Sequence, residues 1–210
     1  MIPASVSIVL AAGVAAGIVA SNTPAGAGNL TIVSGKYTAD APRRILITYG
    51  NEASNRTVKI TGTDRYGNSL VETVTVPLGA PGSIYTANDF ATVTVVTVAG
   101  AWTTNMTVGT NNVGSTPWIV PSLLITPQQI AVAGVNVSGT ATWSVEYTYN
   151  DPNNLPSTLT TPTVFALTAL SAQSATKDGT FAQPVAAYRL TVTSGQGTVR
   201  LDSLQAGRNQ

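Results

Sequence analysis

The chain has neither cysteine nor histidine. Without cysteine it can form no disulfide, no thiolate nucleophile and no cysteine-ligated zinc site. Without histidine it lacks the imidazole base of many hydrolases and the commonest nitrogen ligand for metals. We therefore expect a protein that is not an enzyme and that carries no cofactor and no metal. The lack of cysteine is also compatible with folding in a bacterial cytoplasm.

Charge is scarce as well, because only 9% of the residues are charged, against about 25% in an ordinary globular protein. The surface must therefore be covered largely by Thr, Ser, Asn and Gly. Low charge means weak repulsion between copies, which favours close side-by-side assembly. Ten basic and nine acidic residues give a net charge of +1. The densest basic feature is Arg43-Arg44, which we interpret as the solvated start of a strand, so nucleic-acid binding is not expected.

Signals for α-helices are nearly absent. Val, Thr, Ile and Tyr dominate, and 19 glycines and 12 prolines interrupt the chain. Short runs of alternating apolar and polar residues between such turn residues are typical of sandwiches and barrels. The sequence predicts an all-β fold of two β-sandwich-like modules, Ig-like or jelly-roll-like, preceded by an apolar N-terminal arm. We expect the arm at residues 1–29, the first module at 30–110, a linker at 111–116 and the second module at 117–210.

The apolar stretch Ile2–Ala20 has the composition of a signal-peptide core or a membrane span. No Lys or Arg precedes it, however, and Pro3, Gly13 and Gly17 dilute it. We interpret it as an arm that packs on this chain or on a neighbouring copy, and we expect no association with a membrane.

In the first module, Arg56–Thr63 and Leu70–Val76 are predicted to form a hairpin around a turn at residues 64–68. Gly67 can adopt the positive φ that such a turn requires. Glu72 shares the strand parity of its apolar neighbours. We expect it either to face inward with a partner or to mark a β-bulge.

In the second module, Ala141–Tyr149 alternates cleanly. Its apolar and aromatic side chains share one face and are predicted to be core, while its polar side chains share the other face, in water or at an interface. Val185–Thr193 and Thr198–Leu204 are predicted to form a closing hairpin. Residues 151–162, which include three prolines, are predicted to be a long loop.

The remaining routes to catalysis are weak. A serine nucleophile needs a lysine or carboxylate to activate it, and no serine lies in a strand-to-helix elbow. Paired carboxylates could hydrolyse glycosides, but the candidates are isolated in the sequence: Asp64, Glu72, Asp89, Glu146, Asp151, Asp178 and Asp202. The one cluster with the oxygens for calcium, Asn150–Asn154, is interpreted as a turn.

The three tryptophans could mark an interface or a ligand platform. Trp143 lies on the apolar parity of its strand and is predicted to be core. Trp102 follows a turn at Gly100, and Trp118 lies between two prolines. We interpret both as anchors of protein–protein or inter-module contacts, with sugar stacking as an alternative.

Several runs of residues are similar to structural modules that are common in tailed-phage genomes. In the first module they are Arg43–Ile45, Ile60–Asp64, Gly67-Asn68, Glu72–Thr75, Phe90–Val93 and Val108–Thr110; in the second they are Trp143–Thr148, Gly197–Val199 and Leu204–Gly207. The resemblance spans Leu30–Gly207. It implies a virion structural protein of the head or neck. It carries over no functional residues, because these are patterned β motifs without an active site.

We therefore expect a non-enzymatic virion protein, made in the bacterial host cytoplasm, that acts as a capsid decoration or cement protein. Its expected partners are the major capsid protein or other virion proteins, and it is expected to form a homo-oligomer. A neck, tail or fibre component and a secreted carbohydrate-binding β-sandwich module are the alternatives. The residues expected in protein–protein interfaces are Ile2, Val6, Ile8, Leu10, Val14, Ile18, Trp102 and Trp118. The loop Asn150–Pro162 is expected in such contacts too, and deletion of residues 2–20 is expected to abolish virion incorporation without unfolding the modules.

Overall fold

The structure is a computed structural model that describes residues 1–52, 54–122, 124–155 and 161–209. It confirms the all-β prediction, since fifteen strands and the one-turn 3₁₀ helix η1 (Thr168–Leu170) are the regular elements of these ranges. No helix in the described part of the chain is long and apolar enough to cross a lipid bilayer. The chain divides into two compact units. We call Met1–Ala11 with Val113–Gln210 the terminal unit, and Ala12–Asn112 the central unit.

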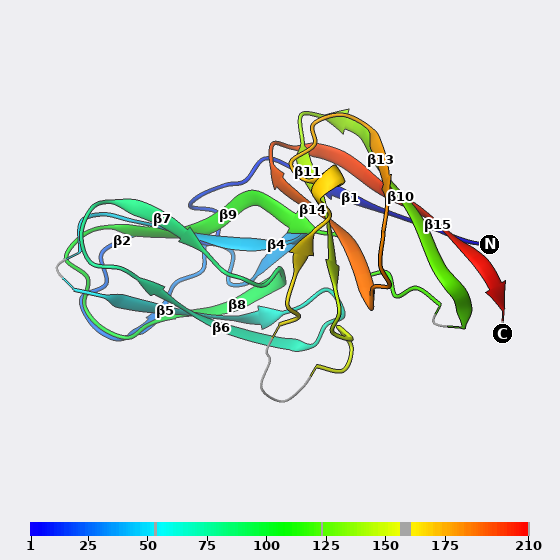
Figure 1. Ribbon diagram of the computed structural model, residues 1–210. Helices are drawn as coiled ribbons and strands as arrows, with labels where there is room; N and C mark the ends of the chain where they lie inside the picture. Colours follow the sequence, from blue (N-terminus) through cyan, green and yellow to red (C-terminus); the bar gives the residue numbers. More distant parts are fainter. Residues whose placement is uncertain (53, 123, 156–160, 210) are drawn as a thin grey trace. The chain divides into compact units, whose positions relative to one another are not determined.

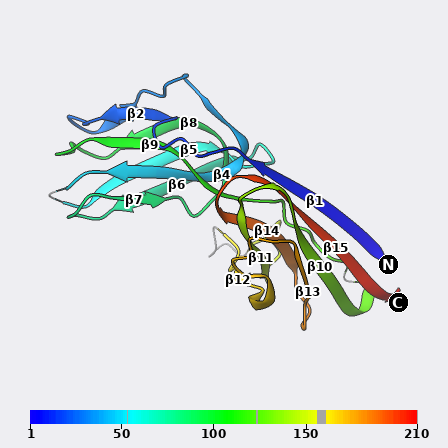
Figure 2. The same cartoon turned by 90° about the horizontal axis from the view of Figure 1, so that it is seen from above.

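The terminal unit is built from both ends of the chain (Figure 1). Its first sheet has the strand order β1-β15-β10-β13, and its second has the order β12-β11-β14-β9, of which only the end of β9 belongs to this unit. Figure 2 shows β1 on the outer side of β15, with β10 on the other side. The strands are β1 (Ile2–Leu10), β9 (Met106–Ser115), β10 (Ile125–Gly139), β11 (Thr142–Thr148), β12 (Phe165–Ala166), β13 (Lys177–Thr180), β14 (Ala187–Ser194) and β15 (Gly197–Asn209).

The two sheets of the terminal unit pack face to face, so closely that one contact leaves no room for a side chain at Gly134. A Cβ built on Gly134 of β10 would lie 2.2 Å from the ring of Trp143 on β11. Trp143 is fully buried, as its strand parity predicted. The hydroxyl of Tyr188 on β14 also donates to the hydroxyl of Ser203 on β15, at 2.7 Å. Apolar side chains from both sheets fill the interior: Ile8, Leu10, Ile130, Val132, Val145, Leu190, Val192, Val199 and Leu201.

Tight glycine corners carry the chain from one sheet to the other. β10 passes into β11 after Gly139, and β14 passes into β15 through Gly195 and Gly197, with φ values of 85°, 76° and 132° at these glycines. The N–H of Thr140 in one corner donates to the carbonyl of Gln196 in the other, at 2.9 Å. The predicted closing hairpin was therefore wrong. β14 and β15 are joined by a tight turn but belong to opposite sheets, because each has an apolar face that the other sheet covers.

The central unit is also all-β. Its strands follow the order β9-β4-β8-β5-β6, with β2 paired to β9, β3 to β8 and β7 to β4. The strands are β2 (Val19–Asn22), β3 (Gly28–Leu30), β4 (Tyr37–Tyr49), β5 (Arg56–Thr63), β6 (Ser69–Val76), β7 (Gly82–Tyr85), β8 (Phe90–Val98) and the first part of β9. Buried aliphatic side chains from β4, β5, β6, β8 and β9 form one core with Ile18, Ile32 and Trp102.

β5 and β6 form the hairpin that the sequence predicted, and they pair along their whole length without a register shift. In the turn, the carboxylate of Asp64 accepts the N–H groups of Tyr66 and Asn68 at 2.8 and 2.9 Å. Gly67 has a φ of 84°, a left-handed conformation that glycine adopts without steric cost. The turn chemistry of this hairpin is thus encoded within five consecutive residues.

Two charged residues of the central unit, Glu72 and Arg43, have side chains that are half-buried and buried, respectively. Glu72 faces inward with a partner, which was one of the two alternatives, because its carboxylate accepts the N–H groups of Ala87 and Asn88 at 2.6 and 3.1 Å. Arg43 was expected to be solvated, and that prediction was wrong. Its side chain is buried and its guanidinium contacts the carboxylate of Asp40 at 2.5 Å. A local charge partner allows this burial.

Glu52 is the most completely enclosed carboxylate of the central unit, with a side chain that is fully shielded from solvent. It accepts the backbone N–H groups and the hydroxyl groups of Thr103 and Thr104, and lies 3.3 Å from Nε of Arg56. Burial alone would raise the pKa of Glu52, but the hydrogen bonds from Thr104 and Thr103 outweigh it and lower the pKa to about 2. The ionised carboxylate therefore holds the segments around residues 52 and 103 together.

Two predicted boundaries differ from the structure. The expected arm at 1–29 is divided: Ile2–Leu10 is a strand of the terminal unit, and the residues from Ala12 on belong to the central unit, where Ile18 is core. The expected linker at 111–116 overlaps the end of β9, and the hydroxyl of Ser115 lies 3.0 Å from that of Thr191. Its Gly, Asn and Ser residues join a sheet because strand pairing uses backbone groups. Deletion of residues 2–20 would therefore remove a paired strand and core residues, so the modules would not be left intact.

Candidate interaction surface

The exposed face of the first sheet of the terminal unit carries mostly small, uncharged side chains. We call it the outer face. Its side chains lie in rows across the strands: Pro3, Leu204, Ala131 and Thr180; then Ser5, Asp202, Ala133 and Asp178; then Ser7, Arg200 and Val135. Leu204 is 40% exposed and Val9, at the end of β1, is 58% exposed. Small side chains on a sheet allow another protein surface to approach closely, as in packed sheets.

Two of the three charges on the outer face, those of Arg200 and Asp202, neutralise each other, while Asp178 lies on the edge strand β13. Arg200 Nη2 lies 2.8 Å from a carboxylate oxygen of Asp202, and the hydroxyl of Ser5 donates to the same carboxylate at 2.6 Å. The hydrogen bond from Arg200 lowers the pKa of Asp202, although partial burial opposes this change. A paired, hydrogen-bonded charge costs less to cover with protein than an isolated charge.

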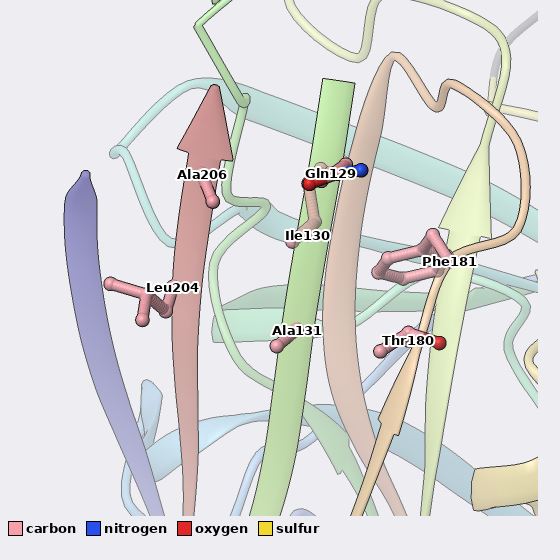
Figure 3. Close-up of a pocket in the computed structure, with 7 residues that line it drawn as sticks. All are labelled: Gln129, Ile130, Ala131, Thr180, Phe181, Leu204 and Ala206. Atoms are coloured by element: carbon pink, nitrogen blue, oxygen red, sulfur yellow. The ribbon is translucent and has the colours of Figure 1, made fainter. Parts of the chain in front are cut away.

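A pocket with a volume of about 380 Å³ opens at one end of this sheet (Figure 3). Its lining comes from β10, β13 and β15 and from Phe181, which follows β13. Gln129 and Thr180 supply its polar side chains, and none of its lining residues is titratable at neutral pH. The lining residues are Gln129, Ile130, Ala131, Thr180, Phe181, Leu204 and Ala206. Such a pocket suits an apolar side chain and offers no group for acid–base chemistry.

The eight residues predicted to form interfaces fall into two groups, one buried and one exposed or half-buried. Ile8, Leu10, Ile18 and Trp102 are buried inside the units, so the prediction that they form external contacts was wrong for these four. The side chains of Ile2 and Val14 are exposed, and Val6 and Trp118 are half-buried. The ring of Trp118 is covered by the guanidinium of Arg189 at 4.5 Å. The apolar side of β1 that carries Ile8 and Leu10 faces the interior of this chain.

An exposed aromatic patch on the terminal unit was not anticipated. Tyr149 and Phe165 are 54% and 41% exposed, and their ring centroids lie 5.6 Å apart. The sequence predicted Tyr149 to be core and the polar face of its strand to lie in water or at an interface. Instead Ser144 and Thr148 are buried, and Tyr149 lies beyond the end of β11. Strand parity predicts a face, but it does not predict where the opposing sheet ends.

Part of the loop Asn150–Pro162, residues 156–160, lies outside the described residues.

Three further carboxylates of the described chain make structural contacts. Glu146 binds Arg189 at 3.0 Å, Asp89 lies 3.9 Å from Arg44, and Asp151 accepts the N–H of Asn153 at 2.9 Å as in a turn. Within the described ranges, no three residues of the His, Cys, Asp and Glu types come together as a metal site would require.

No family model, no curated protein and no solved structure matches this chain.

Proposed function

We propose that this chain is a non-enzymatic structural protein of a tailed-phage virion, a capsid decoration or cement protein that binds the major capsid protein or another virion protein. It would be made in the bacterial host cytoplasm and incorporated into the particle as a homo-oligomer. The phage assignment depends on the sequence resemblance of residues 30–207. The mode of action depends on the surfaces described above.

The outer face is the observation that carries the proposal. It combines small side chains, a neutralised charge pair and an apolar pocket on one sheet of the terminal unit. Stable protein–protein contacts bury roughly 1,200–2,000 Å² in total and are depleted of charge at their centre. The central charges of the outer face, Arg200 and Asp202, are paired with each other, which lowers the cost of covering them in such a contact.

An arginine at Ala131 tests whether the outer face binds the particle. Ala131 is exposed and lines the pocket, so Ala131→Arg places bulk and an unpaired charge at the proposed contact. We expect at least a tenfold loss of this chain from purified virions, while the circular dichroism spectrum stays unchanged. Thr73→Arg, on an exposed position of β6 in the central unit, is the matched control and should be incorporated normally. Normal incorporation of the Ala131 variant would refute a role for the outer face.

The copy number in the particle separates decoration from the alternative of a neck, tail or fibre component. A decoration protein is expected in numbers comparable with the major capsid protein, because it binds a repeated lattice site. A neck or tail component is expected in far fewer copies. Quantitative mass spectrometry of purified virions measures this ratio directly, and complete absence of the chain would refute the virion proposal.

The aromatic patch favours a second candidate function, a carbohydrate-binding module. Exposed aromatic rings can stack on sugar rings, and Tyr149 and Phe165 supply such rings where Trp102 does not, because Trp102 is buried. Glycan-array binding by the intact chain that disappears in Tyr149→Ala would support this function. Binding to particles that persists in Tyr149→Ala, with no glycan signal, would favour the structural role.

A further inference from the structure

The two edges of the first sheet of the terminal unit differ sharply. The edge strand β13 has four residues, and two of them, Lys177 and Asp178, are charged. The edge strand β1 has nine residues, Ile2–Leu10, and none is charged. Proteins usually protect exposed edges from pairing by making them short, charged or covered. Among the described residues, β1 pairs with β15 on one edge and with no strand on the other.

β1 is already fixed in an extended conformation, so its open edge can pair with another strand. β1 pairs with β15 over all nine residues, and its inward side chains Ile8 and Leu10 are buried. A strand that is already extended and anchored loses little conformational entropy when another strand pairs with it. Antiparallel pairing would add about one main-chain hydrogen bond per residue pair, less one for each Pro3 whose missing N–H would face the joint.

We propose that β1 pairs antiparallel with β1 of a second copy of this chain, around a two-fold axis at Val6. This rests on the proposed function only in taking the chain to self-associate. In this register Val6 lies opposite Val6 of the second copy, and Ser5 lies opposite Ser7 of the second copy. The contact is self-complementary, as a two-fold interface requires. No charged side chain of β1 opposes another, because β1 has none.

The neighbouring strand favours this register over its alternatives. On β15, Asp202 lies beside Ser5 and Arg200 lies beside Ser7. With Ser5 opposite Ser7, each row across the joint would run from Asp202 of one copy to Arg200 of the other. A slip of two residues in either direction would place Arg200 in line with Arg200, or Asp202 with Asp202. The rows are about 14 Å long between these charges, and Arg200 and Asp202 are already paired within each copy, so the charges give this register only a small preference and the cross-links described below decide it.

Pairing of this kind would join two four-stranded sheets into one of eight strands and make their outer faces continuous. Val9 and Leu204, which are exposed in the single chain, would lie near the joint. The pair would then present a doubled outer face to a third protein. This gives the homo-oligomer a defined geometry.

Cysteine cross-linking tests the register, because the chain has no cysteine of its own. In Val6→Cys the two thiols would lie directly opposite, with Cβ atoms about 4.5–5.5 Å apart, near the range that a disulfide spans after small adjustments. In Val9→Cys, the matched control, the two thiols would be six residues out of register and about 20 Å apart. We expect mild oxidation to convert most of the Val6 variant, and almost none of the Val9 variant, into a covalent dimer.

A second pair of variants keeps the test decisive if Val6→Cys folds poorly. Ser5→Cys and Ser7→Cys lie on the exposed side of β1. Each alone would place its thiols two residues out of register, beyond the usual Cα range of a disulfide. Mixing the two variants should therefore give a covalent heterodimer that neither gives alone.

Three results would overturn the inference. They are a monomeric native chain in sedimentation at micromolar concentration, equal cross-linking at Val6 and Val9, and no cross-linking in the mixture of the two serine variants. The proposed function fails separately. A chain that dimerises through β1 but is absent from virions would refute the virion role and leave the β1 contact standing.

Discussion

Replacing Gly134 with alanine tests how the two sheets of the terminal unit are held together. The added Cβ would lie 2.2 and 2.3 Å from two carbons of the Trp143 ring. Carbon atoms in contact prefer separations of about 3.5–4.0 Å, so the ring or the strand would have to move by more than about 1 Å. Trp143 is fully buried, so any movement of its ring displaces the side chains packed around it. Overpacking of this kind costs about 1–3 kcal/mol, and we expect the upper end.

Thermal unfolding measures this cost. A loss of about 3 kcal/mol should lower the Tm by at least about 10 °C in a unit of this size. Gly100→Ala is the matched control, since a Cβ there meets nothing within 4 Å, and it should leave the Tm nearly unchanged. Trp143→Phe removes the ring atoms that clash, so the double variant Gly134→Ala/Trp143→Phe should be more stable than the sum of the two single changes predicts. A Tm for Gly134→Ala equal to that of the native chain, or strictly additive effects in the double variant, would refute the reasoning.

Further predictions concern the central unit and the contact between the two sheets. The pKa of Glu52 is about 2 in the folded chain, below its ordinary 4.5, so its contribution to the free energy of unfolding is complete above pH 4.5 and is lost as the pH falls towards 2. Urea unfolding should show a loss of about 2–3 kcal/mol of stability over this range, and Glu52→Gln should flatten the dependence of stability on pH. Gly67→Ala forces a φ of 84° on a residue with a Cβ and should cost about 1 kcal/mol in the same assay, whereas no loss would mean that the turn relaxes. Tyr188→Phe leaves the buried hydroxyl of Ser203 without its 2.7 Å donor and should cost about 1 kcal/mol, while the further change Ser203→Ala should recover part of it.

The sequence by itself determined the local features of this protein. The hairpin of β5 and β6 could be predicted because Asp64 and Gly67 specify the turn and alternation specifies the faces. The burial of Trp143 followed from its strand parity in the same way. The shortage of reactive side chains was also plain, since the chain has no histidine and no cysteine.

Only the tertiary structure decided which segments pair across long distances. β1 joins β15, nearly two hundred residues later, and β14 and β15 separate into opposite sheets, although their sequences suit a hairpin. Alternation shows that a strand has an apolar side, but many strands can cover that side equally well. The outer face, the unprotected edge of β1 and the exposed ring of Tyr149 all follow from where sheets begin and end, and that is set by packing between distant parts of the chain.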